Sequence, residues 1–293
     1  GAMTSLQCVV TEDGGVTISS GDAESDIGPL VHARGTVVAT GASSGALEPE
    51  WDTLSQAALQ ARDAAATSDG ALEQSDTELY AHMRASGLYY GKAFRLIRHA
   101  IATTSPITTD DTALAHGVVV LSTADVDAGS RVTHMVPPAL LDAMLQSSGV
   151  PVQQAMVAAG QTRADEDSAA TLVPVSMDRV WMRSGDAAAT LWESAECLVH
   201  VTVQRAEEDM AIFHCSLLAG DGTVVVRAEG VCLRRIDSSA VTTVDTGLLS
   251  VERHWMPTEA DIDADIDADI DADSSAVQRC LLVGPDTACA VIE

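Results

Sequence analysis

The sequence predicts an α+β fold in which one apolar helix is followed by an antiparallel sheet. Residues 137–146 read PPALLDAMLQ, an apolar run that begins with two prolines. Pro138 suits a first helical turn, because the N–H that it lacks has no intrahelical acceptor there. The downstream sequence alternates as strands do and contains a turn at Gly220-Asp221-Gly222. The expected strands there are residues 172–182, 189–204, 211–219 and 223–236.

The upstream part of the chain indicates more strands and two shorter helices. Residues 6–40 contain strand-like segments and the turn Asp13-Gly14-Gly15. Residues 41–77 are rich in Ala, Ser, Asp and Gln, which favours a linker with little buried structure. The further elements expected are a weak helix at 54–66, a capped helix at 76–87 that ends at a glycine, and strands at 93–104 and 114–124.

The charge and the cysteines exclude several classes of function. A formal charge of −27 makes nucleic acid and anionic membrane surfaces unsuitable partners. The six cysteines form no CxxC pair and no metal-ligand spacing, so we expect no metal and a reduced, cytoplasmic compartment. We expect no signal peptide, and no apolar run in these residues is long enough to span a bilayer. The acidic repeat at 262–270 is too charged to bury and is expected to be disordered.

Asp142 is the candidate for chemistry within the apolar helix. It lies among Leu140, Leu141 and Met144, and Gln146 follows one turn later on the same face. Burial raises the pKa of a carboxyl group, so Asp142 could stay protonated near neutral pH and serve as a general acid. The alternative is an exposed Asp near a helix N-terminus, where the helix dipole stabilises its charge.

Three motifs, in this order, resemble the dehydratase domain of modular polyketide synthases. They are GLYYGKAF at 87–94, PPALLDAMLQ at 137–146 and PVSMDRV at 174–180. The resemblance runs from Leu6 to Ile236 and implies a hot-dog fold, an antiparallel sheet wrapped around a central helix, with a complete C-terminal hot-dog half. The implied domains are the end of the N-terminal half (1–40), a linker (41–77), the C-terminal half (78–238), an acidic linker (239–279) and the start of a ketoreductase-type structural domain (280–293).

The resemblance implies a hydro-lyase. Such a domain eliminates water from a β-hydroxyacyl chain on an acyl carrier protein and leaves an α,β-unsaturated thioester. Asp142 falls on the proton donor of the family and Gln146 on the residue that accompanies it. The positions implied to bind substrate are Tyr90, Gly91, Phe94, Pro138 and Leu141. We expect no intrinsic cofactor, because phosphopantetheine of the carrier protein holds the substrate, and we expect neighbouring synthase domains and a possible homodimer as further partners.

The catalytic histidine of the family is missing from this sequence. The family places it in an HxxxGxxxxP motif, which none of the eight histidines here fits; His32 lies one residue too close to Gly35. We therefore expect the chain to begin after that histidine and to be inactive alone. The alternatives are a non-catalytic, dehydratase-like scaffold (a pseudo-dehydratase) and a related isomerase or cyclase.

Two positions depart from the family pattern, which reads HPALLD and YGPxF. Pro137 replaces the histidine of the first motif, and Lys92 replaces the proline of the second. Lys92 either contacts the phosphate of phosphopantetheine or is a solvated surface lysine. Arg234 and Arg235 likewise form either a patch for carrier docking or a solvated strand end.

Overall fold

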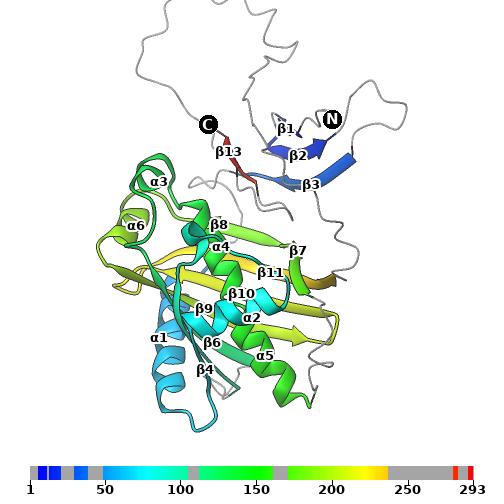
Figure 1. Ribbon diagram of the computed structural model, residues 1–293. Helices are drawn as coiled ribbons and strands as arrows, with labels where there is room; N and C mark the ends of the chain where they lie inside the picture. The colour runs from blue at the N-terminus through cyan, green and yellow to red at the C-terminus, as the bar shows by residue number, and fades with distance from the viewer. Residues whose placement is uncertain are drawn as a thin grey trace, which may run out of the picture.

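The fold is built around one large antiparallel sheet. The computed structural model describes residues 6–11, 13–20, 30–38, 49–104, 112–160, 171–236, 280–282 and 290–292. In these residues the large sheet carries helices on both faces, and two smaller antiparallel sheets come from the two ends of the chain (Figure 1). No helix within the described ranges is long and apolar enough to cross a membrane.

The large sheet has the strand order β4-β5-β6-β9-β10-β11-β7, and β8 also pairs with β11. Its strands are β4 (Leu72–Ser75), β5 (Ile97–Thr103), β6 (Ala115–Ser122), β7 (Thr171–Ser176), β8 (Arg179–Met182), β9 (Glu196–Ala206), β10 (Met210–Leu218) and β11 (Val224–Ile236). The small sheets are β1 (Leu6–Val10), β2 (Gly15–Ser20) and β3 (Leu30–Thr36), and β12 (Cys280–Leu282) with β13 (Ala290–Ile292). The helices are α1 (Trp51–Thr67), α2 (Asp76–Ala85), α3 (Ala128–Thr133), α4 (Pro138–Gln146), α5 (Gly149–Ala158) and α6 (Asp186–Ala189), with 3₁₀ turns η1 (Lys92–Phe94) and η2 (Thr190–Trp192).

The apolar helix predicted at 137–146 is α4, and α5 follows it directly on the same face of the sheet. Sequence reasoning did not predict α5 as a second helix. The break falls at Ser147–Ser148 because Pro151 has no N–H for the Ser147 carbonyl, and its ring would clash with that carbonyl in a continuous helix. Pro151 packs on the sheet at Gly117, where an added Cβ would lie 2.1 Å from its Cγ.

Helix α1 packs on the opposite face of the sheet. Leu217 belongs to the main core with α4 and α5, whereas the next residue, Leu218, contacts buried Ala58 of α1. Successive strand residues point to opposite faces, so α1 and α4 lie on different sides. The hydroxyl of Ser55 donates to the carbonyl of Gly222 over 2.7 Å and fixes the start of α1 to the β10–β11 turn.

Four expected segments differ from the observed elements. The strand expected at 93–104 begins at Ile97, because the residues before it form η1. Within the expected linker 41–77, α1 and β4 belong to the main sheet assembly, because small alanines let α1 lie close to the strands. The strand expected from 189 begins at Glu196, since α6 and the 3₁₀ turn η2 occupy residues 186–192 before it. The strand expected at 172–182 is interrupted between β7 and β8, where Asp178 faces Gly230.

That interruption depends on a glycine of the neighbouring strand. Gly230 has a φ of +61°, and a Cβ there would lie 2.0 Å from a carboxylate oxygen of Asp178. The backbone N–H of Asp178 donates to the carbonyl of Glu229 over 3.0 Å. The PVSMDRV motif therefore forms the kinked edge of the sheet beside β11. The acidic repeat at 262–270 lies outside the described residues.

Candidate active site

Helix α4 holds Asp142 at the edge of the core. Leu140 and Ala143 on this helix are fully buried, and Met144 is 2% exposed, so the helix cannot rotate without exposing apolar surface. Asp142 is half-buried and Gln146 is buried, one turn apart as the sequence predicts. The amide Nε2 of Gln146 donates to the Oδ2 of Asp142 over 2.5 Å.

Gln146 in turn is held by groups from two other elements. Its Nε2 also donates to the carbonyl of Phe94 at the end of η1, over 3.1 Å. The hydroxyl of Tyr80 on α2 donates to its Oε1 over 3.2 Å. The backbone N–H of Ile97 at the start of β5 donates to the Tyr80 hydroxyl over 3.1 Å. A continuous chain of hydrogen bonds thus connects β5 and α2 to the carboxyl group on α4.

This chain fixes the direction of each hydrogen bond. The hydroxyl oxygen of Tyr80 accepts a hydrogen bond from the Ile97 N–H, which can only donate, so the hydroxyl proton can be donated to the Oε1 of Gln146. The Gln146 amide is then oriented with Nε2 toward the acceptor Phe94 carbonyl and toward Oδ2 of Asp142. Oδ2 must accept, so a neutral Asp142 would carry its proton on Oδ1.

The surroundings of Asp142 favour its neutral form. Burial raises the pKa of Asp142 above its ordinary value, and the hydrogen bond from Gln146 opposes this only in part. The same site raises the pKa of Tyr80 to about 12, chiefly through burial. The pKa of Tyr90 is also raised, mainly by burial and to a smaller extent by the nearby charge of Asp142. Both tyrosines remain neutral donors at physiological pH.

The other predicted site residues surround this network unevenly. Tyr90 is half-buried and meets Tyr80 edge to face, with ring centroids 6.3 Å apart. Gly91 is exposed and precedes η1, and Phe94 contributes its carbonyl to Gln146. Pro138 is the first residue of α4, and Leu141 packs in the main core. Substrate binding by these five residues stays a prediction.

Sequence reasoning missed Tyr80, which connects α2 to the candidate acid. The helix itself was predicted, and its Ser75–Glu78 capping box is present. Leu79 and Met83 form its buried face, and Tyr80 lies beside them. A half-buried tyrosine needs a partner for its hydroxyl, and that need was the available signal. The partner, Gln146, lies 66 residues away in sequence. No group of three metal-ligating side chains occurs in the part of the chain that the structure describes.

Comparisons with known proteins identify this architecture. A family model described as "Polyketide synthase dehydratase N-terminal domain" matches residues 57–243. The dehydratase domain from the CurJ module of curacin polyketide synthase is 17% identical, with a TM-score of 0.53, over 81% of this chain and 70% of that one. An inactive mutant of the CurJ dehydratase, bound to a compound, is 16% identical, with a TM-score of 0.52, over 81% and 69%. No curated protein sequence matches.

The sheet with its central helix therefore defines a hot-dog protein of the dehydratase type, and the expected fold is confirmed. The chain belongs to the polyketide synthase dehydratase family. The family description refers to an N-terminal domain, whereas we assigned residues 78–238 to a C-terminal half. The division of the chain into halves stays a prediction.

Proposed function

We propose that this chain supplies the acid of a dehydratase that removes water from a β-hydroxyacyl thioester carried by an acyl carrier protein. The observation that supports the proposal is the geometry of Asp142: a half-buried carboxyl group with a raised pKa, held at one oxygen by Gln146. A hydroxyl group leaves readily only after it gains a proton, and an acid with a pKa close to the working pH donates that proton most effectively.

In the proposed reaction, a base removes the proton α to the thioester carbonyl. The electron pair of that C–H bond forms the new double bond, and the β-hydroxyl group departs as water with the proton from Oδ1 of Asp142. Asp142 becomes a carboxylate, whose charge the Gln146 amide stabilises through Oδ2. No intrinsic cofactor is needed for this elimination.

The base of this reaction is not assigned to any histidine of this sequence. The proposal places it on a histidine of the HxxxGxxxxP motif, supplied from outside these 293 residues. On this basis the isolated chain is inactive, and the active protein combines Asp142 with that histidine.

Dehydration of a β-hydroxyacyl-pantetheine thioester, with the product detected by mass, tests the proposal. The assay compares the isolated chain with the chain extended by its upstream coding sequence, each as wild type and as Asp142→Asn. We expect product only from the extended wild type. Turnover by the isolated wild type would contradict the missing base, and full turnover by the extended Asp142→Asn would contradict Asp142 as the acid. No turnover by the extended wild type would favour the non-catalytic scaffold.

A further inference from the structure

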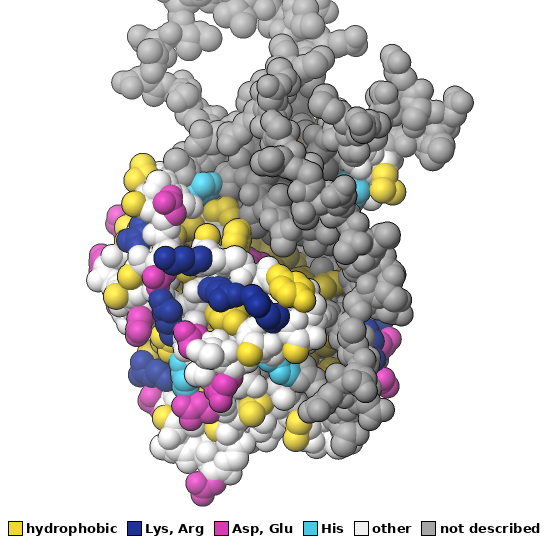
Figure 2. All heavy atoms as spheres, in the orientation of Figure 1, with side chains coloured by type: hydrophobic (Ala, Val, Ile, Leu, Met, Phe, Trp, Pro, Cys, Tyr) yellow, Lys and Arg dark blue, Asp and Glu magenta, His cyan; other side chains and the backbone are white. Residues whose placement is uncertain are grey.

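A groove of about 890 Å³ lies beside the candidate site, between α2 and η1. Tyr80 belongs to both, because its ring lines the groove and its hydroxyl donates to Gln146. Four of the 16 cationic side chains of the protein line this groove, in a chain with a formal charge of −27. They are Arg84, Lys92, Arg95 and Arg98. We call this surface the basic groove; Lys and Arg side chains gather in the middle of the same face in Figure 2.

Among the described residues, Arg98 alone of these four cations forms an ion pair, and the charge of Lys92 also helps to lower the pKa of Asp125. Arg98 forms ion pairs with Asp125 and with Asp76, the latter at 3.9 Å. Among the described residues, Arg84, Lys92 and Arg95 form no ion pair. The groove is lined by these four cations and by two carboxylates, so its net charge is positive. By contrast, Arg205 pairs with Glu207 at 2.6 Å on a different strand.

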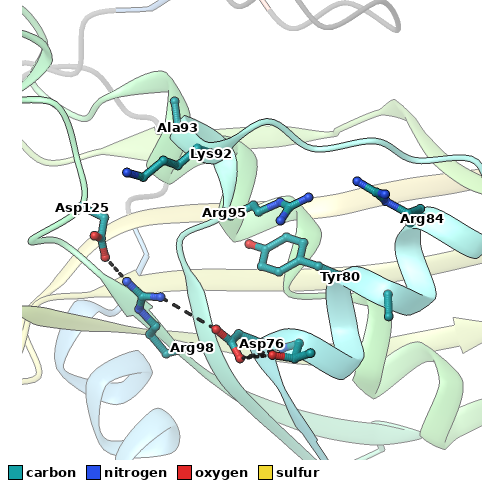
Figure 3. A pocket seen from close by; sticks show the side chains of 10 residues that line it. Asp76, Tyr80, Arg84, Lys92, Ala93, Arg95, Arg98 and Asp125 are labelled. Atoms are coloured by element: carbon teal, nitrogen blue, oxygen red, sulfur yellow. Dashed lines mark hydrogen bonds and ion pairs between the residues drawn. The ribbon is translucent and has the colours of Figure 1, made fainter.

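Arg95 is held in place over an aromatic ring of the groove. The guanidinium of Arg95 lies 5.6 Å from the Tyr80 ring, and its Nε donates to the carbonyl of Tyr90 over 2.9 Å. Figure 3 shows Arg84 and Arg95 pointing toward each other above Tyr80, with Lys92 and Arg98 farther to the left, near Asp125. Like charges that face each other repel, and an anion between them relieves this repulsion. The groove thus favours an anionic occupant.

The placement of the cations on both sides of the groove decides what kind of anion fits. A single phosphate is best bound by donors that converge on one point. Cations that are distributed across an open groove can each pair with a different carboxylate on the surface of a partner protein. They also speed the association of an acidic partner. The net charge of the chain is strongly negative and disfavours an acidic partner in general, so a local positive patch favours binding at that place.

We propose that the basic groove docks an acidic surface of the acyl carrier domain that delivers the substrate to Asp142. This inference rests on the proposed function, since it takes the carrier domain from there. It also assigns Lys92, which replaces the proline of the family motif, to carrier docking. The alternative patch at Arg234 and Arg235 is neutralised by Asp209 and Glu208, at 3.7 and 3.3 Å.

Binding of a recombinant carrier domain without phosphopantetheine tests the proposal by fluorescence anisotropy at 50 mM salt. The variant Arg84→Glu/Lys92→Glu reverses two exposed cations of the groove. The control Arg205→Glu/Arg234→Glu makes the same change in net charge at exposed sites elsewhere. We expect the groove variant to bind about tenfold more weakly and the control to bind within twofold of wild type. Raising salt to 200 mM weakens wild-type binding several-fold, because the attraction is screened.

Three results would overturn the proposal: no binding by the wild type, equal weakening by both variants, or an effect that appears only with phosphopantetheine attached to the carrier domain. The last result would make the phosphate the ligand. In the chain extended by its upstream coding sequence, Asp142→Asn separates docking from chemistry, because it should bind the carrier domain as tightly as the extended wild type while its turnover is lost. Intact docking without turnover by the extended wild type would contradict only the proposed function.

Discussion

The hydroxyl group of Tyr80 should stabilise the protein by a measurable amount. Tyr80→Phe removes the hydrogen bond to Gln146 and leaves the N–H of Ile97 without its acceptor. Ile97 is fully buried, so water cannot replace the lost partner. A buried donor without an acceptor lowers the free energy of unfolding by about 1–3 kcal/mol. For a domain of this size, a loss of about 2 kcal/mol lowers the melting temperature by about 4–8 °C.

Tyr89→Phe is the matched control for this substitution. It makes the same chemical change on a side chain that is 71% exposed, so it should alter the stability by less than about 0.5 kcal/mol. Thermal unfolding followed by circular dichroism compares the two variants with wild type. Equal melting temperatures for Tyr80→Phe and Tyr89→Phe would refute the hydrogen-bond chain from β5 to α4.

Three further predictions concern packing, capping and pH. Gly117→Ala should lose about 1–3 kcal/mol in urea unfolding because its Cβ collides with Pro151, whereas Gly91→Ala, which has open space, should lose much less. Ser75→Ala removes the N-cap of α2 and should cost about 1 kcal/mol in the same assay. The raised pKa of Asp142 means that its contribution to stability is fully present below its unfolded pKa and is lost as pH rises through its folded pKa. The free energy of unfolding of Asp142→Asn should therefore rise relative to that of wild type from pH 3 to pH 7. A difference that stays constant over this range would contradict burial as the cause.

The local part of the site was predictable from the sequence because it lies within one helix. The four-residue spacing of Asp142 and Gln146 places both on one face, and the leucines around them predict burial. The strands β10 and β11 also agree with their patterns to within one or two residues. In each case the signal lies in neighbouring residues of the chain.

The parts that escaped prediction depend on contacts between distant segments. Tyr80 reaches Gln146 only because α2 and α4 pack on the same side of the sheet, and no periodicity in either helix encodes that pairing. The basic groove likewise combines α2, η1 and the start of β5. Arg234 and Arg235 gave two interpretations from sequence, and only their ion pairs with the turn before β10 favour the structural one.

The protonation of Asp142 is the central claim, and its titration measures it most directly. The carboxyl carbon resonances of ¹³C-labelled wild type are followed by NMR from pH 2 to pH 9, and the signal missing from Asp142→Asn is assigned to Asp142. We predict a midpoint above the ordinary aspartate value of about 3.9. A midpoint at or below that value would show a carboxylate that stays charged, and would contradict Asp142 as the acid.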